Sequence, residues 1–99
     1  GLIPGVGASN VPIDAKIVVS FSEPIALSSI ANHTGARVHG PTGAVLDGVW
    51  STNGNDIIFT PATRLESGGA QYVYSLTPGI TDLAGNPADI DTLVVFHTL

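Results

Sequence analysis

Clusters of glycine and proline recur at fairly regular spacing along this chain and separate short runs of alternating residues. The 12 Gly and 7 Pro of its 99 residues fall mostly in these clusters, which read PGVG, GPTG, NGN, SGG and AGNP. Glycine permits positive φ and proline fixes φ, so such clusters are typical of turns. No stretch of ten residues shows a helical period. The regular spacing of the turn clusters therefore predicts an all-β chain.

The runs between the clusters have the two-residue period of half-buried strands. In residues 16–21, KIVVSF, the side chains of Ile17, Val19 and Phe21 share one face. The segment 26–34 is expected to hold one short helical turn with Ser28 or Ser29 as its cap. Seven candidate strands predict a Greek-key, immunoglobulin-like β-sandwich; they lie near residues 2–6, 15–21, 36–39, 44–51, 56–60, 70–77 and 92–98.

Composition limits the classes of function. With 43% hydrophobic and 11% charged residues, the chain is expected to form one domain over residues 1–99, cut from a larger protein and monomeric when isolated. The net charge of −5, with only Lys16, Arg37 and Arg64 as cations, provides no basic face for nucleic acid. No apolar run approaches the ~20 residues of a membrane span, and without Cys there is no disulfide or thiolate metal site.

The segment STNGND predicts a hairpin that fixes the facing of the single tryptophan. A two-residue type I′ turn at residues 53–54 would place Trp50 opposite Ile57, and one at residues 54–55 would place it opposite Phe59. Both registers put Trp50 on the core face, whereas a bulge would turn it outward, where it could stack on a sugar.

The segment LESGGAQYVY places Leu65 seven positions before Tyr72, across a turn and at the start of a strand. This spacing resembles a tyrosine corner, in which the phenol hydroxyl bonds the backbone just upstream. We therefore expect Tyr72 to serve folding rather than catalysis.

The usual catalytic patterns are missing. His33, His39 and His97 lack the spacing of a local metal pair, and no complete nucleotide-binding or nucleophile-elbow motif is found. An isopeptide cross-link would need Lys16 to face the core, and the alternation of residues 16–21 points it the other way. Asn32-His33-Thr34 matches the N-glycosylation sequon, a three-residue pattern that also arises by chance.

Five motifs in order resemble one known family: FSEPI at 21–25, IIFTP at 57–61, the spacing of residues 65–72, GITDLAGNP at 79–87 and FHT at 96–98. Together they are similar to the bacterial Ig-like domains named for S-layer proteins (Big_5), over nearly the whole chain. The resemblance implies a non-catalytic module without a cofactor, often in tandem, in secreted or cell-surface proteins such as adhesins, with neighbouring domains as its partners. A structural spacer is expected, and a module that binds calcium, glycan or protein through its end loops is the alternative.

The stretch GITDLAGNP is interpreted first as a turn. An Asx-type turn at Asp82, a positive φ at Gly85 and a stiff exit at Pro87 account for its residues. Calcium is the alternative, because Asp82, Asp89 and Asp91 offer carboxylate oxygens; the segment lacks the later ligands and the Gly of an EF-hand loop.

Glu23 bears on the same question. In the expected connectivity the loops after the second and sixth strands emerge at one end, which makes Glu23 and Asp82 neighbours. The two carboxylates could share a calcium ion, or they could accept N–H groups of the facing loop and hold this end shut. The second arrangement is favoured, because both loops need partners for their backbone amides.

Overall fold

The computed structural model describes residues 1–31 and 34–99. Within them the chain forms seven strands and one 3₁₀ turn, close to the positions that the alternation predicts. The strand near the N-terminus is shorter than expected, and the fourth strand begins at Gly48 rather than at residue 44. The elements are β1 (Leu2–Ile3), β2 (Ile17–Ser20), η1 (Leu27–Ser29), β3 (Ala36–His39), β4 (Gly48–Asn53), β5 (Asp56–Pro61), β6 (Gln71–Leu76) and β7 (Thr92–His97).

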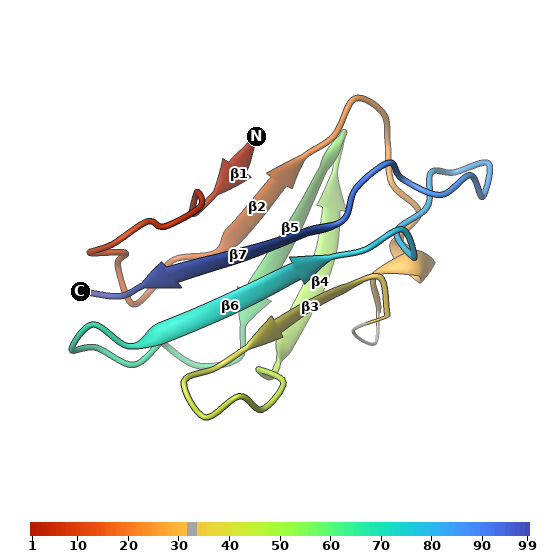
Figure 1. The fold of residues 1–99 in the computed structure, drawn as a ribbon. Coiled ribbons are helices and arrows are strands. Elements are labelled where there is room, and N and C mark those ends of the chain that lie inside the picture. The colour runs from red at the N-terminus through yellow and green to blue at the C-terminus, as the bar shows by residue number, and fades with distance from the viewer. Residues whose placement is uncertain (32–33) are drawn as a thin grey trace.

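The strands form two antiparallel sheets that face each other (Figure 1). One sheet has the order β1-β2-β5-β4 and the other has the order β3-β6-β7. Lettered A to G along the chain, these are the ABED and CFG sheets of a constant-type immunoglobulin sandwich. The predicted Greek-key sandwich is therefore confirmed.

Alternate side chains of both sheets point inward and build one core. In β2, Ile17 and Val19 are buried, while Lys16 just before the strand is exposed, as the alternation predicts. On the facing sheet the rings of Tyr72 and Phe96 stack with centroids 5.7 Å apart. The core consists of Val11, Ile17, Val19, Ile25, Ile30, Ala36, Val38, Trp50, Ile57, Phe59, Leu65, Tyr72, Tyr74, Leu76, Ile80, Val94 and Phe96.

The β4–β5 hairpin has the second of the two expected registers. Trp50 pairs with Phe59, their ring centroids lie 5.0 Å apart, and Trp50 is only 6% exposed. The turn type differs from the expectation: of its two central residues only Gly54 has a positive φ, +61°, which is the pattern of a type II′ turn rather than type I′. Trp50 is a core residue and presents no platform for a sugar.

Tyr72 forms the predicted tyrosine corner. The backbone N–H of Glu66 donates to the Tyr72 hydroxyl at 2.8 Å. The buried Thr98 extends this corner, since its hydroxyl donates to the carbonyl of Glu66 at 2.6 Å and accepts the N–H of Ala70 at 3.0 Å. The crossing between β5 and β6 is thereby tied to the last residues of the chain.

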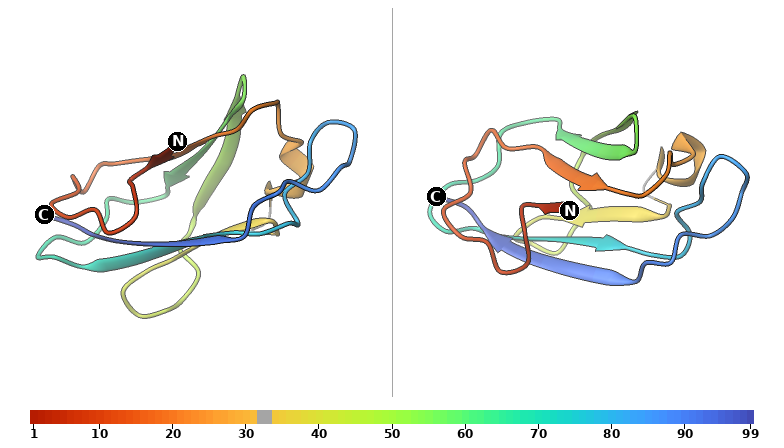
Figure 2. Two further views of the ribbon diagram at one scale, coloured as in Figure 1. Left: turned by 45° about the horizontal axis from the view of Figure 1, so that its top comes forward. Right: turned by 90° about the horizontal axis from the view of Figure 1, so that it is seen from above.

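The second tyrosine of β6, Tyr74, fixes the N-terminal segment. Its hydroxyl donates to the carbonyl of Pro4, and burial raises the pKa of Tyr74 to about 12. Beyond Pro4 the chain crosses from the first sheet to the edge of the second, where Val11 bridges Thr98 in parallel (Figure 2). The N-terminal segment thus contacts both sheets.

The sandwich is elongated, with principal extents of 42 × 22 × 21 Å. Gly1 lies beside Ser20 at the end of β2, and its carbonyl accepts the Ser20 N–H at 2.9 Å. Leu99 lies at one end of the long axis, whereas the N-terminus lies nearer its middle (Figures 1 and 2). In the part of the chain that the structure describes, no helix is long and apolar enough to cross a membrane.

Candidate functional site at the loop end

The stretch GITDLAGNP forms the loop between β6 and β7, and the side chain of Asp82 organises it. One carboxylate oxygen, Oδ1, accepts the backbone N–H groups of Ala84 and Asn86, each at 2.9 Å. The Gly85 N–H donates to the carbonyl of Asp82 at 3.1 Å, and Gly85 has a φ of +86°. The predicted Asx-type turn with a left-handed glycine is confirmed.

The two sides of this loop are also joined to each other. The Asp82 N–H donates to the carbonyl of Asn86 at 3.0 Å, and the Ala88 N–H donates to the carbonyl of Ile80 at 2.7 Å. Thr81 and Pro87 form an antiparallel bridge between these bonds. The loop is therefore a small closed hairpin whose backbone donors are largely satisfied within it.

The bonds to Asp82 favour its ionised form. The backbone N–H of Asn86 is the largest of the causes that hold the pKa of Asp82 below its ordinary value of 3.8. The Asn86 side-chain amide and the Ala84 N–H also lower the pKa, whereas burial of this 9% exposed residue opposes them. Near neutral pH the loop thus contains a carboxylate held by its own amides.

The loop after β2 lies against this hairpin, so the expectation that both emerge at one end is confirmed. Ile25 bridges Asp82, and the Ala26 N–H donates to the carbonyl of Thr81 at 2.9 Å. The Thr81 N–H in turn donates to the Ser29 hydroxyl at 3.0 Å. The two loops are thus joined through Thr81, which bonds the backbone of Ala26 and the side chain of Ser29.

The expected helix cap was wrong. The N-cap of η1 is Ala26, which makes no side-chain cap bond. Ser29 is the last residue of η1, and its hydroxyl donates to the Ala26 carbonyl at 2.7 Å while it accepts the Thr81 N–H. Its hydroxyl links the two loops instead of capping the turn.

Gly35 allows the two loops to approach so closely. A Cβ at this position would lie 2.5 Å from the Ser29 carbonyl oxygen and 2.7 Å from the Ile80 backbone nitrogen, distances that real Cβ atoms do not reach. The Gly35 N–H donates to the carbonyl of Ser29 at 2.8 Å, and the Gly35 carbonyl accepts the Thr77 N–H at 3.0 Å. Any other residue here would push the loops apart.

The acidic candidates meet only in part. Glu23, Asp82 and Asp89 line a hollow of about 310 Å³ between the loops, whereas Asp91 does not line it. The full lining is Phe21, Ser22, Glu23, Ile25, Asp82, Asn86, Pro87, Ala88, Asp89 and Ile90. Among residues 1–31 and 34–99, no group of three or more His, Cys, Asp or Glu is arranged to hold a metal ion.

The expected role of the carboxylates needs one correction. Asp82 does bond backbone amides, but they belong to its own loop and not to the facing loop. Its second oxygen, Oδ2, accepts the Asn86 side-chain amide at 3.2 Å. Asp82 therefore uses most of the acceptor capacity of its carboxylate within its own loop.

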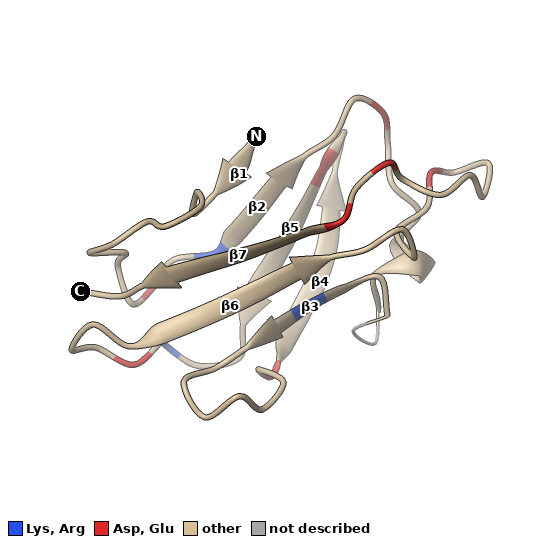
Figure 3. Ribbon diagram, viewed as in Figure 1, with Lys and Arg blue, Asp and Glu red and all other residues tan. Residues whose placement is uncertain are grey.

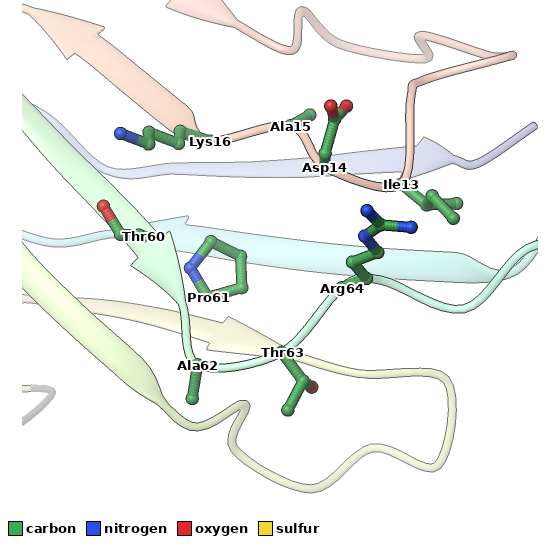
Figure 4. A pocket seen from close by; sticks show the side chains of 9 residues that line it. All are labelled: Ile13, Asp14, Ala15, Lys16, Thr60, Pro61, Ala62, Thr63 and Arg64. Atoms are coloured by element: carbon green, nitrogen blue, oxygen red, sulfur yellow. The ribbon is translucent and has the colours of Figure 1, made fainter.

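A second hollow, of about 220 Å³, lies toward the opposite end of the sandwich (Figure 4). It is formed by residues 13–16 and 60–64 and has Lys16 and Arg64 at its rim. In Figure 3 acidic residues lie at both ends of the sandwich. The sequence of the β2–β3 and β6–β7 loops contains no Lys or Arg, whereas Lys16 and Arg64 line the second hollow.

The two histidines that the structure describes lie on different strands. Asn32 and His33 of the sequon lie outside the described residues. His39 is on β3 and His97 is on β7, and β6 runs between these two strands.

Comparison with known proteins agrees with this architecture. The model of the bacterial Ig-like domain family (Big_5) matches residues 1–98. Among solved structures, the chain is similar to PcoC, a copper resistance protein from Escherichia coli, with a TM-score of 0.66 and 15% sequence identity over 100% of this chain and 96% of that chain. At this identity the likeness shows the fold alone. No curated protein matches the chain.

Proposed function

The chain belongs to the family of bacterial Ig-like domains, and from this membership and the closed loop pair we propose that it is a non-catalytic structural spacer. In this role it is one module of a longer secreted or cell-surface bacterial protein and sets the distance between neighbouring domains. The observation that carries the proposal is the use of Asp82 to close its own loop.

The closed loop supports a spacer because its polar groups already have partners within the chain. A binding loop commonly offers free donors and acceptors to a ligand, and such loops are drawn from the less stable parts of a fold. Here Asp82 accepts three hydrogen bonds from Ala84 and Asn86. Opening the loop to a ligand would break these bonds.

The shape of the domain supports the same role. The sandwich is 42 Å long; the C-terminus lies at one end of it and the N-terminus lies nearer its middle (Figures 1 and 2). The two termini are therefore separated along the long axis, so neighbouring domains attach at different points and the module holds them apart.

The burial of Trp50 also favours a spacer over a glycan-binding module. Sugar recognition commonly uses an aromatic face that is open to solvent, whereas Trp50 is 6% exposed and packs on Phe59. The aromatic rings of β6 and β7, those of Tyr72, Tyr74 and Phe96, are likewise buried.

Binding through the end loops is the second candidate. The hollow of about 310 Å³ between them is the observation that favours it, since Glu23 and Asp89 at its lining are exposed and carry negative charge. Its ligand would be a cation or a positively charged group.

Exchange of the module within its parent protein tests the spacer. Replacement by an unrelated Ig-like sandwich of the same length should preserve the parent's function, and deletion should impair it. A parent that loses its function on the exchange, although the replacement is folded, would show that the surface of this module matters and not only its length.

A further inference from the structure

The tip of the closed β6–β7 hairpin carries an exposed apolar side chain. Leu83 is 73% exposed, the highest value among the large hydrophobic residues that the structure describes. It follows Asp82 directly, and the bonds from Ala84 and Asn86 to Asp82 fix the backbone on both sides of it. An apolar group on a backbone fixed in this way binds a partner at a low cost in conformational entropy.

The hollow toward the other end of the sandwich has the complementary character. Ile13, Ala15 and Pro61 supply apolar surface, and Lys16 and Arg64 lie at its rim (Figure 4). Its volume of about 220 Å³ exceeds the ~150 Å³ of a cavity that admits benzene, so a leucine side chain fits. Two of the three Lys and Arg residues of the chain line this one hollow, together with one acid, Asp14, so cations exceed acids in its lining.

The linings of the two hollows differ in charge: Glu23, Asp82 and Asp89 line the one beside the Leu83 hairpin, and Lys16, Arg64 and Asp14 line the other. Glu23 and Asp89 lie in the loops that flank the Leu83 hairpin, and both are exposed. Lys16 and Arg64 are exposed as well. The excess of cations over Asp14 in the second hollow favours its encounter with the acidic loop end over the arrangement in which two acidic loop ends would meet.

We propose that two copies of this chain associate head to tail, with Leu83 of one copy inserted into the hollow beside Lys16 and Arg64 of the next. Glu23 and Asp89 of the first copy then face these two cations. The contact joins different surfaces of the two copies, so it is heterologous and repeats along a row of domains. The proposal rests on the spacer function and adds to it the joint between consecutive modules.

A joint of this kind is small, because one hairpin contacts one open hollow. Contacts well below the area of a standard interface are weak and transient. The isolated domain is therefore a monomer at micromolar concentration and associates only toward millimolar concentration. Between linked domains the same contact forms more readily, since the linker raises the local concentration of one end near the other.

The test is self-association of the isolated domain, followed by sedimentation equilibrium and by backbone amide NMR shifts over a dilution series. We expect concentration-dependent shifts concentrated at residues 82–86, at Glu23 and Asp89, and at residues 13–16 and 60–64. The variant L83S should weaken association by at least about tenfold through loss of the buried side chain, and L93S is its matched control. Leu93 is 62% exposed on β7, outside both surfaces, so L93S should associate as the wild type does.

The charge contribution is tested in the same way. The double variant K16Q/R64Q should associate several-fold more weakly than the wild type. Added salt should lower the affinity of the wild type toward that of the double variant. R37Q removes the third cation, which lies on β3 and not in the hollow. It therefore controls for the change in net charge.

Mixing the variants tests the head-to-tail geometry itself. L83S retains an intact hollow and K16Q/R64Q retains an intact hairpin, so the mixture should form a one-to-one dimer with near wild-type affinity and nothing larger. Absence of this dimer, or an effect of L93S equal to that of L83S, would overturn the proposal. A wild-type domain with unchanged shifts up to millimolar concentration would overturn it too, while the exchange experiment would still decide the spacer function.

Discussion

Asp82 and Asn86 are joined by three hydrogen bonds. The Asn86 N–H donates to Oδ1 of Asp82 at 2.9 Å, the Asn86 side-chain amide donates to Oδ2 at 3.2 Å, and the Asp82 N–H donates to the carbonyl of Asn86 at 3.0 Å. This pair closes the base of the β6–β7 loop. Backbone and side chain act together, so changes at Asp82 should affect the whole loop.

Replacing Asp82 should destabilise the domain. D82A leaves the N–H groups of Ala84 and Asn86 without their acceptor, and we expect thermal unfolding to occur several degrees lower. D89A is the control, because Asp89 is an exposed acid near the same hollow and its loss should leave the melting temperature nearly unchanged. Equal melting temperatures for D82A and the wild type would contradict the closed-loop account.

The stability contributed by Asp82 should depend on pH. Its pKa is lower in the folded chain than its ordinary value of 3.8, so its carboxylate stabilises the fold above that pH. This stabilisation is lost as the pH falls from 3.8 through the folded value. The difference in melting temperature between wild type and D82N should therefore be constant near neutral pH and shrink below pH 3.8. A difference that grows on acidification would show that the sign of the shift is wrong.

Gly35 should tolerate no side chain. G35A places a methyl group 2.5 Å from the Ser29 carbonyl oxygen, and overpacking of this kind costs about 1–3 kcal/mol of unfolding free energy. G40A is a matched control, since its nearest atoms are Tyr72 Cε2 at 3.9 Å and Leu46 Cδ1 at 4.0 Å, ordinary contact distances. Urea denaturation of both variants measures the difference, and equal stability would contradict the close approach of the two loops.

The tyrosine corner should contribute measurably to stability. Y72F removes the acceptor of the Glu66 N–H but keeps the ring that stacks on Phe96. We expect a loss of about 1–3 kcal/mol in the unfolding free energy, because a partly buried donor remains unpaired. S75A, on the opposite face of β6, should change it little. If Y72F were as stable as the wild type, the corner would be only a packing feature.

Much of the fold follows from local pattern. The alternation in residues 16–21 predicts the facing of Ile17 and Val19, and the spacing of Leu65 and Tyr72 predicts the corner. Turn chemistry likewise predicts the Asx turn at Asp82. In each case the residues that interact are close in sequence or belong to one strand. Their local spacing is therefore enough to predict the feature.

The features that escaped prediction depend on contacts between distant segments. Ser29 was expected to cap a helix, but its hydroxyl is placed by Thr81, a residue of the other loop. The need for glycine at Gly35 depends on Ile80 in the same way. Asp82 was expected to bond the facing loop, yet its own loop supplies closer amides, and only the folded backbone shows which donors lie within reach.

A calcium titration of the isolated domain, read by backbone amide NMR shifts together with a melting curve, tests the central claim most directly. The account holds that the oxygens of Asp82 serve the loop itself, so the amides of Glu23, Asp82 and Asp89 should not shift saturably at sub-millimolar calcium, and the melting temperature should stay constant. Saturable shifts at these residues with a rising melting temperature would contradict it, because a ligand that binds only the folded state stabilises that state. The end loops would then be a metal site rather than a closed joint.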